Sequence, residues 1–166
     1  MSLWSESNTV VNAIIPVANA WDSAPVVSDI IHLENFNRCT FLIVTGATSA
    51  VEPVVTVFAG ISNSSCDTAI AFKYRTQIAA VPGAAGSDVT SALIEATSVG
   101  FSMTAAKVGG IYIIEVDASD VAAAGVNFDH CAVNIAEDAD TPQTGCVIAV
   151  LSEPRNPQAV LATAID

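Results

Sequence analysis

The sequence predicts an all-β protein, a single β-sandwich or jelly-roll-like domain with extended N- and C-terminal arms. Apolar segments rich in β-branched residues recur at roughly ten-residue spacing, which is typical of sandwiches and jelly rolls. Clusters of Gly, Pro, Asn, Asp and Ser separate these segments and predict turns. The pattern contains no repeated helices of about ten or more residues, which an α/β fold would place between its strands. With 166 residues, the chain is long enough for one domain with a substantial core.

The N-terminal half contains five predicted strands. They span residues 9–15, 26–33, 39–45, 54–59 and 68–75. We expect Pro16 to stop the first, because proline cannot donate a ladder hydrogen bond. The third is too continuously apolar to have a solvated face, so it should be central in its sheet. Residues 60–67 should form a polar loop, and Ile70, Phe72 and Tyr74 should line one face of the fifth strand.

The C-terminal half begins with a long loop and ends with the most regular strands. Residues 77–89 predict a flexible loop, and residues 90–96 predict either a strand or a short helix. Further strands are predicted at residues 111–117, 128–136 and 146–151, which are apolar and rich in β-branched side chains. Between the first two of these, Ser119 can cap and Gly125 can end a helix of one or two turns.

We divide the chain into an N-terminal arm (residues 1–8), the β-domain (9–155) and an extended C-terminal tail (156–166). Large aliphatic residues in the tail favour burial, since an exposed tail would have little to offset the entropy of ordering. The tail should therefore lie along a neighbouring subunit, or along its own body beside a subunit seam. The predicted interface residues are Leu3, Trp4, Trp21, Val160, Leu161 and Ile165.

Composition excludes several classes of partner. Lys and Arg number 5 against 17 Asp and Glu, for a net charge of -12. Phosphate contacts need Lys and Arg, so the balance argues against nucleic acid and against anionic membranes. The hydrophobic fraction of 52% and the mean hydropathy of +0.54 are high for so charged a chain, which favours apolar surface that meets another subunit.

The N-terminus lacks the basic and apolar regions of a secretory signal. Residues 39–61 come nearest to a membrane span, but Glu52-Pro53 and a turn at Thr45 to Ser49 divide them into two strands. The four cysteines contain no C-x-x-C pair, which disfavours zinc. In the absence of an export signal, we expect buried free thiols. Cys66, in a polar stretch, should be the exposed one.

No residue pattern predicts catalysis, a cofactor or a metal. Asp129-His130 is the nearest approach to a hydrolase triad, but no G-x-S-x-G elbow accompanies it, and we expect His130 and His32 to be strand residues hydrogen-bonded to neighbours. Glu137, Asp138 and Asp140 outline a loop calcium site without the spacing of an EF-hand. A solvated hairpin turn explains them better.

Residues 112–118, 125–128 and 148–155, with the short 158–160 segment, resemble small proteins of tailed bacteriophages that are encoded beside the major capsid protein. These are similar to capsid cement or decoration proteins, and the likeness extends more weakly through residues 29–45 and 69–75. The resemblance implies a non-enzymatic virion protein on the capsid exterior, synthesised in the host bacterial cytoplasm. Its implied partners are the major capsid protein and further copies of itself, as a homotrimer.

Two other classes remain as hypotheses. One is a receptor- or glycan-binding module of a phage fibre or tail, in which Trp4, Trp21, Tyr74 and the 77–89 loop would supply the contacts. The other is a β-sandwich hydrolase, for which the sequence offers no convergent His, Ser and Asp set.

Overall fold

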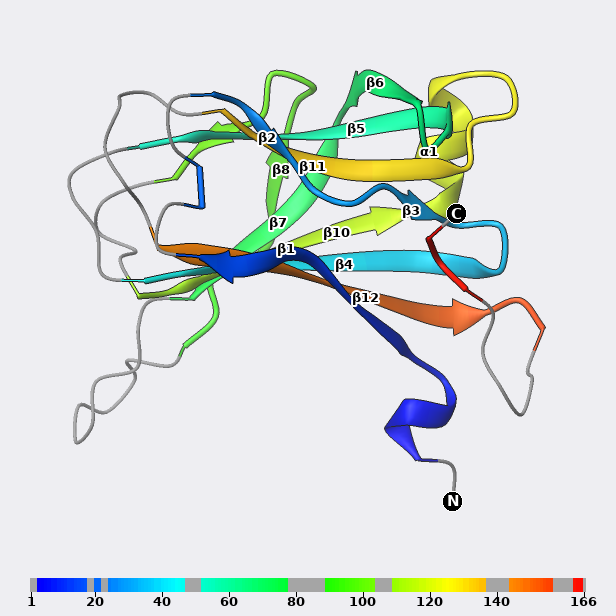
Figure 1. Ribbon diagram of the computed structural model, residues 1–166, viewed down its shortest axis with the longest axis horizontal. Coiled ribbons are helices and arrows are strands. Elements are labelled where there is room, and N and C mark those ends of the chain that lie inside the picture. Colours follow the sequence, from blue (N-terminus) through cyan, green and yellow to red (C-terminus); the bar gives the residue numbers. More distant parts are fainter. Residues whose placement is uncertain are drawn as a thin grey trace.

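Two antiparallel β-sheets pack face to face in the computed structural model, which describes residues 3–17, 20–21, 24–46, 52–77, 89–103, 109–136, 144–156 and 163–165 (Figure 1). This arrangement confirms the predicted all-β, sandwich-like class. In chain order the elements are η1 (Trp4–Glu6), β1 (Thr9–Val17), β2 (Val26–Val27), β3 (Ile31–His32), β4 (Phe36–Thr45), β5 (Val54–Ser62), β6 (Ser65–Ile70), β7 (Phe72–Gln77), β8 (Ile94–Ala96), β9 (Phe101–Ser102), β10 (Ile111–Asp117), α1 (Ala118–Ala124), β11 (His130–Ala136) and β12 (Gly145–Pro154).

The first sheet, which we call sheet A, has the strand order β1-β12-β4-β10-β7-β8. The second, sheet B, has the order β2-β11-β5-β6, with β3 also pairing β11 and β9 also pairing β5. All of these pairs are antiparallel. The first and the last strand of the chain, β1 and β12, therefore pair at one side of sheet A, and β2 with β3 forms one interrupted edge of sheet B.

The core lies between the two sheets and follows the two-residue period of the strands. In β4, Cys39, Phe41 and Ile43 are fully buried and belong to the core cluster, whereas Leu42 and Val44 point to the opposite face and are half-buried. The position of β4 between β12 and β10 confirms that this strand is central. The expectation that it lacks a solvated face is wrong, because sheet B covers only one side of sheet A.

The short helix predicted after residue 117 is present as α1. Asp117 occupies the N-cap in place of Ser119, without a side-chain cap hydrogen bond, and Gly125 follows the last helical residue. Ala118 and Val121 are buried in the core, and α1 contacts strands of both sheets. The helix therefore closes one end of the sandwich.

Two predicted boundaries in the first half are wrong. β1 runs through Pro16 to Val17, with register irregularities after Asn12 and Ile14. Proline is tolerated there because β1 is an edge strand, where one side of the backbone needs no ladder partner. The predicted strand 26–33 is split into β2 and β3, because Ser28 turns inward and bonds to the backbone N–H of Val133.

The segment from residue 60 to residue 75 also differs from expectation. A tight hairpin joins β5 to β6 where a polar loop is predicted. The single predicted strand 68–75 is two strands, β6 in sheet B and β7 in sheet A, separated only by Ala71. Ile70 and Phe72 are both buried on either side of this change, so the alternating pattern continues while the chain passes from one sheet to the other.

Residues 39–61 contain two strands, β4 and β5, as the sequence predicts. The two strands belong to different sheets. Among the described residues, no helix is long and apolar enough to cross a membrane.

Candidate functional site

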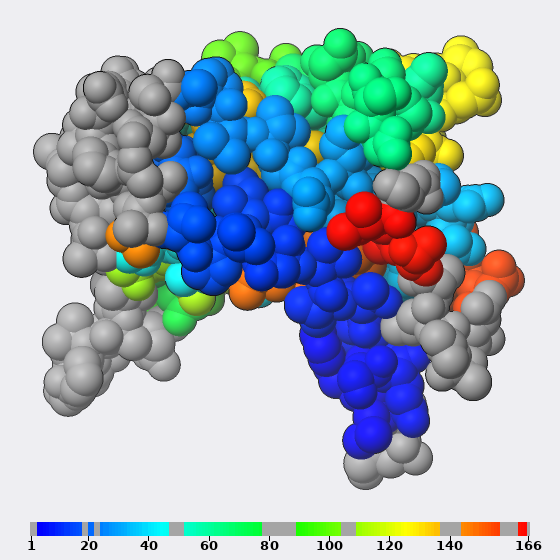
Figure 2. Space-filling view, viewed as in Figure 1, coloured from blue at the N-terminus to red at the C-terminus, as the bar shows by residue number. Residues whose placement is uncertain are grey.

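The N-terminal arm projects from the body beyond the start of β1 (Figures 1 and 2). Leu3 and Trp4 are 66% and 60% exposed. The arm makes one turn of 3-10 helix, in which the Glu6 carboxylate accepts a hydrogen bond from the Leu3 N–H at 2.8 Å and the Asn8 side-chain amide donates to the Trp4 carbonyl at 2.7 Å. These local bonds hold the arm in a turned conformation.

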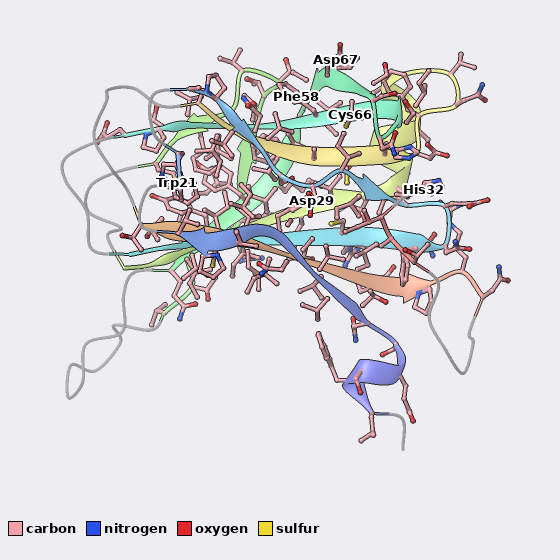
Figure 3. The ribbon with its side chains drawn as sticks, viewed as in Figure 1. Trp21, Asp29, His32, Phe58, Cys66 and Asp67 are labelled. Carbon is pink, nitrogen blue, oxygen red and sulfur yellow. The ribbon has the colours of Figure 1, made fainter. Side chains whose placement is uncertain are left out.

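Trp21 is not an interface residue of this chain. Its side chain has 0% exposure and lies between the sheets (Figure 3). A Cβ atom at Gly145 would come within 2.3 Å of the indole ring, so the ring packs directly against the backbone at the start of β12. The prediction that Trp21 contacts a partner is therefore wrong, because its whole aromatic surface is buried in the core of its own chain.

The end of the C-terminal tail lies along its own body, beside β3 (Figure 1). The His32 N–H donates to the Ala164 carbonyl at 2.9 Å, and Ala164 is buried in the core cluster. Ile165 is 41% exposed next to it. Val160 and Leu161, which the sequence places in the same contact, lie outside the described residues.

The outer face of sheet A carries a second apolar surface, which we call the apolar face. It consists of half-buried aliphatic side chains on the three central strands: Leu42, Val44, Ile111, Ile113, Ile148 and Val150. The strand register places Ile148, Leu42 and Ile113 in one row across β12, β4 and β10. Among the described residues, no strand or helix covers this face in the way that sheet B covers the other.

Three of the chain's five cationic residues border the apolar face. In the register of β7 with β10, Arg75 lies opposite Ile113 and Lys73 lies opposite Glu115. Arg38 contacts Asp117 at 3.1 Å and Glu153 at 3.4 Å. The hydrogen bond to Asp117, and then the charge of that carboxylate, raise the pKa of Arg38 above its ordinary value. Glu115, Asp117 and Glu153 lie beside these cations, so the apolar face has a border of mixed charge.

A groove of about 900 Å³ lies between the β6–β7 connection, β8 and α1. Its lining is mostly small side chains, with Lys73, Glu95 and Asp120 as the charged groups. The described lining contains no histidine or cysteine, so it offers no base and thiol pair for nucleophilic catalysis. That the protein is not an enzyme stays a prediction.

The two histidines of the chain and one aspartate meet at the end of β3 and β11. His32 Nε2 lies 3.2 Å from Asp129 Oδ2, and His130 Nδ1 lies 2.5 Å from Asp129 Oδ1. The two imidazole rings stack with centroids 4.3 Å apart and planes inclined by 6°. The predicted hydrogen bonding of both histidines is confirmed. Their shared partner was not predicted, because His32 and Asp129 lie 97 residues apart and no local pattern links them.

All four cysteines are free thiols, as the sequence predicts, but their exposure differs from expectation. Cys66 is buried beneath the β5–β6 hairpin, and Cys146 on β12 is the more accessible one. Burial raises the pKa of Cys66 to about 12. A hydrogen bond to Cys39, together with complete burial, raises the pKa of Cys131. The acidic residues Glu137, Asp138 and Asp140 lie outside the described residues.

The fold and its surfaces define an antiparallel β-sandwich protein with an exposed apolar arm. Comparison with models of known protein families found no match, and a search of curated proteins found none. Among solved structures, the fold is similar to the crystal structure of the SPBc2 prophage-derived protein YomS, with 10% sequence identity, a TM-score of 0.45, and coverage of 88% of this chain and 93% of that chain. A likeness at this level assigns neither an origin nor a function to this chain.

Proposed function

We propose that this protein is a virion structural protein that binds the outside of a tailed-phage capsid as a cement or decoration protein and ties adjacent capsomers together. The observation that carries the proposal is the projecting arm, which holds Leu3 and Trp4 in solvent (Figure 2). Large apolar side chains on an exposed segment are typical of an interaction site. The sequence resemblance to phage cement proteins supplies the class of partner.

The arm is suited to clasp a neighbouring protein. Its backbone is already turned by the bonds from Leu3 to Glu6 and from Asn8 to Trp4, so less conformational entropy is lost when it binds. Trp4 supplies a large contact area with few rotatable bonds. The major capsid protein is the proposed partner of the arm.

The apolar face is the proposed contact between copies of this chain in a homotrimer. Its aliphatic centre and charged border match the usual anatomy of an interface, in which a dry core is surrounded by a polar rim. Light scattering of the purified protein tests the assembly directly, since a trimer has three times the 17.0 kDa mass of one chain. A monomer mass at micromolar concentration would remove the apolar face from the proposal.

Quantitative mass spectrometry of purified virions tests the cement role itself. A cement protein is present in many copies, comparable with those of the major capsid protein. A count of only a few copies per particle would exclude the role and point to a tail, fibre or portal position.

A matched pair of variants tests the arm. Trp4→Ala should weaken binding to expanded capsids by about 2 kcal/mol or more, roughly thirtyfold, because buried tryptophans are common interface hot spots. Val126→Ala is the control, since Val126 is 85% exposed in the turn after α1, away from the arm (Figure 1). Equal capsid binding by Trp4→Ala and the wild type would contradict the clasp.

The receptor- or glycan-binding alternative has lost one of its four proposed contacts, because Trp21 is buried. Tyr74 is half-buried, and its ring is stacked on Phe101 with centroids 4.0 Å apart. Most of the 77–89 loop lies outside the described residues. A glycan array at high protein concentration remains the direct test of this alternative.

A further inference from the structure

We propose that His32, Asp129 and His130 form a binding site for a divalent transition-metal ion of the zinc or nickel kind. The proposal goes beyond the cement role and does not depend on it. The potential ligand atoms, one from each residue, all lie within 4.8 Å of one another.

The fold brings these three residues together through the pairing of β3 with β11. His32 and His130 are directly opposite each other in that register. The backbone of Asp129 is held on both sides, because its N–H donates to the Gly60 carbonyl at 3.1 Å and its carbonyl accepts from the Leu33 N–H at 2.7 Å. The segments around Leu33 and Gly60 therefore fix the backbone of Asp129, so that its carboxylate faces the two imidazoles.

The ligand set selects the class of ion. Two imidazole nitrogens and a carboxylate suit zinc, nickel or copper, whereas calcium and magnesium prefer sites made of oxygen alone. Side-chain exposures of 17% for His32, 43% for Asp129 and 6% for His130 leave one side open to solvent. Water can complete the coordination shell from that side.

Metal binding requires a local rearrangement. In the described arrangement both ring nitrogens face the same carboxylate, and the rings are parallel. A coordinated metal lies near the plane of each imidazole, so at least one ring must turn. His32 is the ring that can turn, because it is the more exposed of the two. The ligating nitrogen of each ring must carry no hydrogen, so the tautomer of each histidine must leave that nitrogen bare.

The site has a structural consequence for the tail. His32 uses its backbone N–H to hold the Ala164 carbonyl while its ring belongs to the cluster. A bound ion would connect β3 to β11 through the side chains of His32 and His130, in addition to the short backbone ladder between these strands. We therefore expect the metal to hold the end of the tail more firmly on the body.

The test is titration of the tag-free, full-length protein with zinc chloride, followed by two-dimensional NMR of the imidazole groups. Because the chain contains two histidines, both signals can be assigned to this cluster without ambiguity. We expect both to shift or be replaced at one zinc ion per chain, and magnesium and calcium to leave them unchanged. Unchanged signals of both histidines at millimolar zinc would overturn the proposal, whatever ions bind elsewhere on the protein.

Variants separate this cluster from other ligands. Asp129→Asn and His32→Gln should each weaken zinc affinity by at least tenfold in calorimetry, by removal of a ligand. Asp67→Asn removes an exposed carboxylate far from His32 (Figure 3), and Cys146→Ser removes the most accessible thiol; neither should change the affinity. Zinc affinity retained in both His32→Gln and Asp129→Asn would refute the site.

Thermal unfolding adds a readout that does not depend on spectral assignment. At a free zinc concentration of 100 times the dissociation constant, binding to the folded state alone shifts the folding equilibrium about a hundredfold. The midpoint should rise equally in wild type and in Asp67→Asn, and should rise less in His32→Gln, in proportion to its lost affinity. A rise of the same size in His32→Gln would place the stabilising ion elsewhere and contradict the proposal.

Discussion

The two tryptophans of this chain provide a test of its core and of its arm in one pair of substitutions. Trp21 has 0% exposure and Trp4 has 60% exposure. Trp21→Ala removes a fully buried indole that packs against Gly145, and truncations of this kind cost about 3–5 kcal/mol. The total stability of a domain is about 5–15 kcal/mol, so a large part of it would be lost.

The expected temperature shift follows from the size of the chain. For about 150–250 residues, 1 kcal/mol changes the melting midpoint by about 2–4 °C, so Trp21→Ala should lower it by roughly 6–20 °C. Trp4→Ala should change stability by no more than about 0.5 kcal/mol, because it acts on an exposed side chain of the arm.

The assay is urea and thermal denaturation monitored by circular dichroism, with light scattering on the same samples. Each variant retains one tryptophan, so fluorescence reports separately on the remaining one. Trp21 in the Trp4→Ala variant should emit at a short wavelength that shifts to the red on unfolding. Trp4 in a folded Trp21→Ala variant should emit as a solvated indole.

The reasoning would be refuted by a Trp21→Ala protein of unchanged stability that fails to assemble. Such a result would mean that Trp21 faces a partner, as the sequence alone suggests, and not the core. A large loss of stability in Trp4→Ala would equally contradict the description of the arm as an exposed segment.

Three further predictions concern a glycine, the thiols and the tail. Gly60→Ala should cost about 1–3 kcal/mol in urea denaturation, because its Cβ would lie 1.9 Å from the Ser65 carbonyl oxygen and force β5 and β6 apart; unchanged stability would contradict this packing. In the folded protein at pH 8, Ellman's reagent should modify Cys146 well before Cys66. The contribution of the buried Cys66 thiol is fully present below its ordinary pKa of 9.0 and is lost as the pH rises towards about 12, so stability should fall in that range, less so in Cys66→Ala. Deletion of residues 157–166 should leave a folded β-domain with weakened assembly or capsid attachment; a truncated protein that assembles and binds shells as tightly as the full chain would show that the tail is not a clasp.

The strands with the clearest pattern were predictable from local sequence. Residues 39–45, 111–117 and 146–151 are all within strands of sheet A, because β-branched and apolar composition acts over a few neighbouring residues. The helix at 118–124 was equally predictable, since the alanines favour helix and Gly125 follows its end.

Which sheet a strand joins was not available from the sequence. The alternation of apolar and polar residues around Ile70 and Phe72 predicts one strand. The side-chain period of two is the same whether or not the chain passes from one sheet to the other. Only the packing of two sheets on one core explains why the change falls at Ala71. The split of β2 from β3 likewise depends on Ser28, which bonds to β11.

The roles of individual side chains were decided by contacts between distant segments. Trp4 and Trp21 both lie in short polar surroundings, and only the fold places one in solvent and the other over Gly145. His32 meets Asp129 and His130 only because β3 pairs with the start of β11. Local sequence determines the strand propensity of such residues, whereas burial and partners depend on long-range pairing that no short pattern encodes.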